Sequence, residues 1–191
     1  MWQELKFNLK NEPGCGLIQH NGDLANPLNP FVKEMKQYTS KRNKTDADHE
    51  MIAQYQFLGG LYDSGLGIML PSEVIEATIN GGARKFKEGI LAKSGLYVLK
   101  DAKLVFEGPQ TPKEMWEDGR FTFQKMVVIA RSRVLATRPI FNEWSAAITV
   151  NFEDEVCDAG QVEKWLKKAG QIVGMCDWRP RYGRFSATLA V

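Results

Sequence analysis

The feature that most constrains the fold is one amphipathic helix near the C-terminus, between residues 158 and 174. Asp158 is predicted to cap it, because Gln161 follows three residues later in the spacing of a capping box. Apolar side chains then recur at helical spacing until Gly174, a residue type that commonly ends helices. This stripe consists of Val162, Trp165, Leu166, Ala169, Ile172 and Val173. A helix with a single apolar stripe must bury it, so the chain needs a sheet or another helix beside it.

Alternation of apolar and polar residues predicts four strands. Residues 5–9 alternate as expected for a strand with one face in water, and residues 185–191 give the last strand. Residues 127–136 and 144–152 are predicted as two further strands that pair with each other.

A second helix is predicted over residues 72–87, with Ser72 as its cap and Gly89 at its end. The order of elements is then strand, helix, strand, strand, helix, strand. This is the ferredoxin-like, or RRM-like, βαββαβ arrangement, an α+β fold with an antiparallel sheet, helices on one face and an open face on the other.

Two insertions interrupt this core, so the chain is predicted to be a single domain, residues 1–191, with insertions at about 11–70 and about 89–125. The first is too long and too apolar for a structureless loop. Helices are expected in it from Asn29-Pro30 and over residues 47–58, and short strands in the second over residues 96–99 and 104–106.

Composition bounds the class of protein. The 191 residues are 43% hydrophobic, which suffices for a sizeable core, and no stretch approaches the ~20 apolar residues of a membrane span. The N-terminus lacks the basic and apolar regions of a secretory signal, so a cytoplasmic protein is expected. Cys15, Cys157 and Cys176 lack metal-ligand spacing and are expected to be reduced thiols, and no cofactor is indicated. A net charge of +2 does not by itself indicate a nucleic-acid binder, so local clustering must carry that argument.

The densest functional signal is the loop from residue 174 to residue 185. It combines arginines, which bind phosphate bidentately, with aromatic side chains, which stack on bases, and with glycines, which allow close approach of the backbone. The predicted nucleic-acid-binding residues here are Trp178, Arg179, Arg181, Tyr182 and Arg184. The alternative is that the arginines pair with local carboxylates and Trp178 covers the core, although Asp177 is the one acid nearby.

Three other groups of basic residues stand out. The first two add predicted binding residues: Lys41, Arg42 and Lys44 in the basic stretch 33–44, and Arg131, Arg133 and Arg138 further on. Arg131 and Arg133 share strand parity and should project from one face. The stretch 33–44 is equally consistent with a solvated, mobile loop. Arg84, Lys85 and Lys87 stand at a predicted helix end, where cations complement the macrodipole, so a structural role is favoured there.

Catalysis is not expected. His20 lies in a polar turn and is a candidate general base, but a lone histidine in such a turn is more often a structural hydrogen-bonding group. Asp46, Asp48, His49 and Glu50 suggest a metal site, yet the two aspartates flank a predicted helix start, where capping explains them better. No Ser-His-Asp order, phosphate loop or paired-cysteine motif is present.

Four segments resemble those of a widespread group of uncharacterised bacteriophage and prophage proteins, over nearly the full length. They are residues 20–30 (HNGDLANPLNP), 45–49 (TDADH), 138–141 (RPIF) with Trp144, and 177–185 (DWRPRYGRF). At the level of the fold, the order of elements and the closing loop also resemble the RAMP superfamily, the ferredoxin-like backbone subunits of CRISPR effectors. The RAMP loop is usually richer in glycine than residues 174–183 are.

The resemblance implies a protein that binds single-stranded DNA or RNA along the backbone of the strand, as a homo-oligomer assembled side by side. The insertions would then clamp the strand or contact the neighbouring copy. Two alternatives stay open: an anti-defence protein that binds a host CRISPR complex, and a metal-independent ribonuclease that uses His20.

Overall fold

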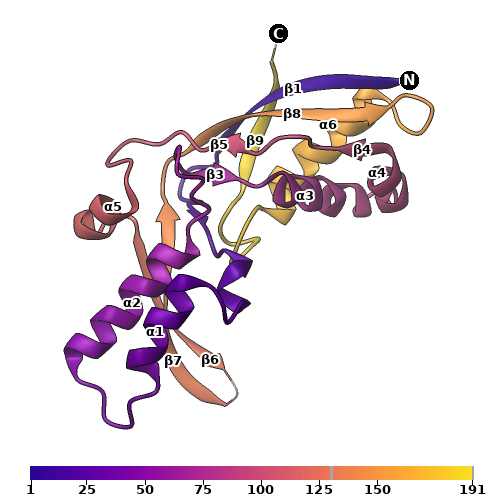
Figure 1. Ribbon diagram of the computed structural model, residues 1–191. Coiled ribbons are helices and arrows are strands. Elements are labelled where there is room, and N and C mark those ends of the chain that lie inside the picture. The colour runs from indigo at the N-terminus through magenta and orange to yellow at the C-terminus, as the bar shows by residue number, and fades with distance from the viewer. Residues whose placement is uncertain (130, 191) are drawn as a thin grey trace. The chain divides into compact units, whose positions relative to one another are not determined.

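The computed structural model describes residues 1–129 and 131–190, and this part of the chain has an α+β fold with antiparallel sheets and six α-helices (Figure 1). The chain divides into two compact units. Unit 1 comprises Met1–Leu17, Ser64–Glu107 and Phe141–Val191, and unit 2 comprises Ile18–Asp63 and Gly108–Ile140. The expectation of a single domain with two insertions stays a prediction.

Unit 1 contains a four-stranded antiparallel sheet in the order β4-β8-β1-β9. Its strands are β1 (Trp2–Asn11), β4 (Leu96–Tyr97), β8 (Ser145–Glu153) and β9 (Phe185–Leu189). The alternation predicted for the first strand is confirmed, since Phe7 and Leu9 are each 1% exposed while their neighbours along β1 face solvent. Phe7 lies opposite Ile148 of β8, and Leu9 lies opposite Ala187 of β9, so these apolar side chains share one buried face.

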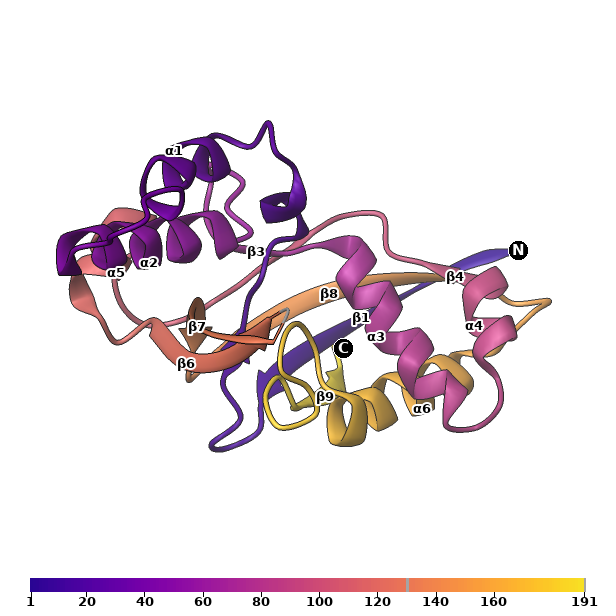
Figure 2. The ribbon, with the colours of Figure 1, turned by 90° about the horizontal axis from the view of Figure 1, so that it is seen from below.

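Helices α3 and α6 cover that face of the sheet (Figure 2). Unit 1 contains α3 (Ser72–Arg84), α4 (Gly89–Gly95), α6 (Ala159–Lys168) and a π-helix, η2 (Ala169–Val173). The predicted capping box of α6 is confirmed: Asp158 Oδ1 accepts the Gln161 N–H at 2.8 Å, and Gln161 Oε1 accepts the Asp158 N–H at 3.0 Å. A Cβ on Gly82 of α3 would lie 2.1 Å from the Trp165 carbonyl oxygen, so this glycine permits the close contact with α6.

Two details of the helix predicted over residues 72–87 are wrong. Ser72 does not cap α3, because it is the first helical residue and its N–H donates to Asp101 Oδ1 at 2.9 Å. Gly89 does not end α3 but begins α4, since α3 stops at Arg84 and the chain turns at Lys87, where φ is +63°. Of the strand predicted over residues 104–106, the structure has only an isolated bridge between Val105 and Ser145. The preceding residues form β5 (Ala102–Lys103), which pairs with β3 (Met69–Leu70).

Two helices of unit 2 follow the predicted starts, α1 (Pro30–Thr39) and α2 (Asp46–Gly60). The 3₁₀-helix η1 (Gly22–Ala25) and the α-helix α5 (Pro112–Asp118) were not predicted. The Asn29 side chain accepts the Phe31 N–H and so caps α1, as expected before a proline at the first helical position. Phe57 of α2 packs on Trp116 of α5 with ring centroids 5.5 Å apart, which fixes the shorter helix on the longer one.

The sheet of unit 2 corrects the predicted strand 127–136. Strands β6 (Thr122–Ile129) and β7 (Ser132–Phe141) form an antiparallel hairpin, and β2 (Leu17–Ile18) adjoins β7. The chain therefore reverses inside the segment predicted as one strand, and among the described residues β8 pairs with β1 and β4, not with this segment. Periodicity missed the reversal because apolar β-formers continue on both sides of a turn that contains no glycine, proline or asparagine.

Within the described residues, no helix combines the length and the apolar character that crossing a bilayer requires.

Candidate nucleic-acid interface

The loop between η2 and β9 in unit 1 is held by its own backbone. The Met175 N–H donates to the Gly183 carbonyl oxygen at 2.8 Å, and the Gly183 N–H donates to the Gly16 carbonyl oxygen at 2.9 Å. Gly183 has φ +75°, and a Cβ there would lie 2.0 Å from the Met175 carbonyl oxygen. Residues 174–184, hereafter the C-terminal loop, thus form a turn whose ends are held by backbone hydrogen bonds.

Arg179 and Arg181 of the C-terminal loop are exposed, while Trp178 and Tyr182 beside them are half-buried. Asp177 lies within the same turn, and its carboxylate accepts the Trp178 N–H at 2.9 Å. Among the described residues neither arginine forms an ion pair, so the alternative in which these two arginines pair with local carboxylates is wrong. Two guanidinium groups next to two amphipathic rings can bind phosphate and stack on bases.

The other predicted residue of this loop, Arg184, has a different environment. Its Nε and Nη2 groups point at the Cys15 sulfur, at 3.3 and 3.0 Å. Sequence analysis missed this contact because the two residues lie 169 positions apart along the chain. Cys176 in the same loop is no candidate nucleophile, because burial raises the pKa of its thiol to about 12.

In unit 2, Lys41 and Lys44 form contacts that stabilise the connection between α1 and α2. Lys41 Nζ lies 2.5 Å from Asp48 Oδ1 and 5.3 Å from the centroid of the Tyr38 ring. Lys44 Nζ donates to the Lys41 carbonyl oxygen at 2.7 Å. Arg42 between them is exposed. The connection is therefore held by its own hydrogen bonds, and Arg42 is exposed without such a bond among the described residues.

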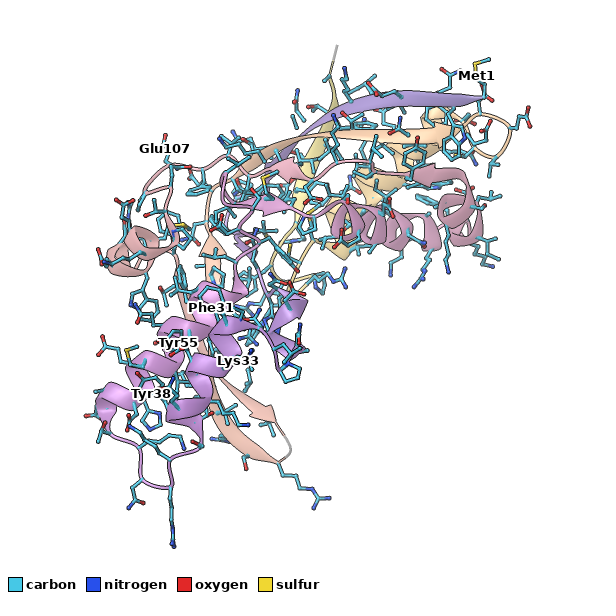
Figure 3. All side chains as sticks on the ribbon, viewed as in Figure 1. Met1, Phe31, Lys33, Tyr38, Tyr55 and Glu107 are labelled. Atoms are coloured by element: carbon cyan, nitrogen blue, oxygen red, sulfur yellow. The ribbon has the colours of Figure 1, made fainter. Side chains whose placement is uncertain are left out.

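Asp48 accepts hydrogen bonds from both sides of this turn. The hydrogen bond from Lys41 and the backbone N–H of Thr45 together lower the pKa of its carboxyl to about 2. Asp48 also completes a capping box with Thr45, which confirms the capping role expected for the acids at the start of α2. Behind this turn Tyr38 of α1 and Tyr55 of α2 lie together, with ring centroids 6.1 Å apart (Figure 3).

The β6–β7 hairpin separates the three arginines that were predicted together. Arg131 lies in the turn with φ +68°, so it is not a strand residue and the parity expected for it with Arg133 is wrong. Arg131 and Arg133 are both exposed, and strands β6 and β7 extend toward the same end of unit 2 as the connection between α1 and α2 (Figure 1). Arg138 lies further back in β7, half-buried, and its Nη1 donates to the Thr137 carbonyl oxygen at 3.0 Å.

The histidines do not form a recognisable catalytic group. The His20 carbonyl oxygen accepts the Tyr62 hydroxyl at 3.1 Å, and the ring is half-buried. His49 is exposed on the first turn of α2. In the part of the chain that the structure describes, no cluster of three or more histidine, cysteine, aspartate or glutamate side chains is arranged to hold a metal ion.

The solvent face of the unit 1 sheet carries small polar side chains and lysines. Asn8 of β1 lies between Ala147 of β8 and Thr188 of β9, and Lys10 lies between Ser145 and Ser186. The aromatic pair of this face, exposed Trp2 and half-buried Tyr97, lies toward its β4 edge with ring centroids 4.8 Å apart. The centre of the face therefore lacks an aromatic platform for stacking bases, and the C-terminal loop is the better candidate interface of unit 1.

Comparisons with models of known protein families and with curated proteins find no match to this chain. Its function is therefore argued from the site itself.

Proposed function

We propose that this protein binds single-stranded nucleic acid through the phosphate backbone, with the C-terminal loop as the principal contact. The observation that carries the proposal is a turn that presents Arg179 and Arg181, both exposed and without an ion-pair partner in the described residues, beside Trp178 and Tyr182. A contact of this composition favours single strands, because unpaired bases expose the faces that aromatic rings stack on.

The proposal includes the ferredoxin-like core for unit 1. Taking β1, α3, β4, β8, α6 and β9 as the six elements gives the order βαββαβ, with the sheet order β4-β8-β1-β9. This supports the fold-level resemblance to RAMP subunits and, with it, the side-by-side assembly of copies on a strand. The assignment moves the second core strand from residues 127–136 to Leu96–Tyr97.

Unit 2 contributes a second basic surface to the proposal. Its exposed arginines are Arg42 in the turn after α1, and Arg131 and Arg133 at the end of the hairpin. Lys41 and Lys44 are left out, because Asp48 and a backbone carbonyl group already bind their ammonium groups. Arg138 and Arg184 are left out as principal contacts, because their guanidinium groups already bind the Thr137 carbonyl oxygen and the Cys15 sulfur.

Fluorescence anisotropy tests the proposal, with labelled single-stranded DNA, single-stranded RNA and duplex DNA of about 20 nucleotides or base pairs, at about 50 and about 200 mM salt. We expect tighter binding of single strands than of duplex, and a loss of roughly tenfold or more in affinity at the higher salt, because phosphate contacts release counterions. RNA that stays intact during the titration agrees with the proposal, and RNA that is cleaved supports the ribonuclease alternative. Failure to bind any of the three at the lower salt would contradict the proposal and favour a protein-directed role.

A further inference from the structure

An open cavity of about 560 Å³ lies between the end of α3 and the helix α4 in unit 1. Its polar and charged lining comes from both helices and from the turn that joins them, and the exposed side chain of Ile90 forms part of its edge. The lining includes Asn80, Arg84, Lys87, Ile90, Lys93 and Ser94. Three of these residues are cations and none is an acid, so the charge of the cavity favours anions.

The positive charge of this cavity is not neutralised inside unit 1. Arg84 Nε donates to Asn80 Oδ1 at 3.2 Å, which orients the guanidinium, and no ion pair involves Arg84, Lys87 or Lys93 in the described residues. The nearest acid in sequence, Glu88, accepts the Trp165 Nε1–H at 2.5 Å and lies 3.7 Å from Lys164 Nζ. Glu88 therefore binds residues of α6. Helix α6 and helix α4 are different neighbours of α3 (Figure 2).

Lys87 occupies a backbone position that glycine fills better. The Lys87 N–H donates to the Arg84 carbonyl oxygen at 3.1 Å, and the Glu88 N–H donates to the Ala83 carbonyl oxygen at 3.1 Å. These two bonds form a Schellman motif that ends α3, with Lys87 at the left-handed position and φ +63°. A side chain there is strained, so stability of the turn does not explain why this residue is lysine. Complementing the α3 dipole explains Arg84, but it explains neither this strain nor Lys93 on α4.

We propose that this cavity is a phosphate-binding site, in which Arg84, Lys87 and Lys93 bind a phosphate ester and Asn80 orients Arg84. The ligand is either a backbone phosphate of a bound strand or the phosphate of a free nucleotide, whose sugar or base would lie against Ile90. As a strand contact the site rests on the proposed function. It shares no residue with the C-terminal loop, so either site can fail without the other.

The strained turn supplies an unusually clean test. Lys87→Gly removes one charge from the cavity and relieves the backbone strain, so the melting temperature of this variant should equal or exceed that of the parent protein. Lys85→Gln is the matched control, since Lys85 is exposed two residues away and does not line the cavity. The probes are labelled single-stranded DNA, followed by anisotropy, and ADP, followed by calorimetry.

We expect Lys87→Gly to weaken binding of the strand or of ADP by roughly fivefold to tenfold, and Lys85→Gln to weaken it less than about twofold. A loss confined to the strand assigns the site to backbone phosphates, and a loss confined to ADP assigns it to a free nucleotide. The proposal is overturned if Lys87→Gly is folded and binds both probes like the parent, if both variants lose affinity equally, or if the parent protein binds neither probe. Arg179→Gln with Arg181→Gln, measured alongside, reports separately on the C-terminal loop.

Discussion

Two turns of this protein each contain three basic residues but use their charge in opposite ways. In the α1–α2 connection, Lys41 binds Asp48 and Lys44 binds a backbone carbonyl group, so the cations hold the turn together. In the C-terminal loop, backbone hydrogen bonds through Gly183 hold the turn, and Arg179 and Arg181 extend into solvent. Charge that is available to a ligand is therefore the charge that the fold does not already use.

The difference originates in the neighbouring residues. Asp48 lies seven positions after Lys41, at the third position of a helix that its own carboxylate helps to cap, so it brings a fixed negative charge to the turn. The acid of the C-terminal loop, Asp177, instead accepts the backbone N–H of the next residue. A count of basic residues cannot distinguish these two cases, because each stretch contains three of them.

The largest expected effect comes from changing the glycine that holds the C-terminal loop. Gly183→Ala places a Cβ within 2.0 Å of the Met175 carbonyl oxygen in a residue with φ +75°, so the loop must rearrange. We expect a loss of at least about 3 kcal/mol in the free energy of unfolding, measured by urea denaturation.

Gly14→Ala is the matched control for this prediction. Gly14 has φ +72°, but no atom lies within 4 Å of the position that its Cβ would take. The strain of the left-handed backbone alone costs about 1 kcal/mol. Equal losses in the two variants would show that the contact with Met175 does not hold the loop.

A smaller effect is expected from Asp48→Asn, and it depends on pH. The folded pKa of Asp48 is lowered to about 2, below its unfolded value of about 3.9, so its stabilising contribution is complete at neutral pH and disappears as the pH falls toward 2. The melting temperature of Asp48→Asn should lie several degrees below that of the parent at pH 6, and the gap should close in strong acid. Thermal melts followed by circular dichroism measure this gap.

Asp46→Asn serves as the control, because Asp46 is exposed on the same helical turn and binds neither Lys41 nor Thr45. A constant gap between the Asp48 variant and the parent from neutral to acidic pH would mean that the ion pair with Lys41 does not close this turn.

The parts of the fold that local signals specify were predictable. The caps of α1 and α6 and the alternation of β1 depend on residues within a few positions of one another, and the structure has them as predicted. The hairpin of β6 and β7 was not predictable, because its turn has no sequence signature and apolar β-formers continue on both sides of it. Strand β4, Leu96–Tyr97, lies within the short strand predicted over residues 96–99, but its pairing with β8 in the main sheet was not predicted.

The candidate site was predictable in composition but not in geometry. The sequence indicated the arginines and aromatic residues of the C-terminal loop, and the structure leaves Arg179 and Arg181 exposed. It did not indicate that Cys15 would face Arg184, or that Lys93 of α4 would line one cavity with Arg84. These groupings depend on how distant segments pack, and residue counts contain no information about that.

The most direct test of the comparison is the salt dependence of binding to single-stranded DNA in two double variants that each remove two positive charges. Arg179→Gln with Arg181→Gln should weaken binding and reduce the slope of log K against log salt by about 1.4, because two phosphate contacts are lost. Lys41→Gln with Lys44→Gln should leave that slope unchanged within about 0.3, even if the α1–α2 connection is less stable. The reverse pattern, or equal slopes in both variants, would contradict the account that the C-terminal loop holds the available charge.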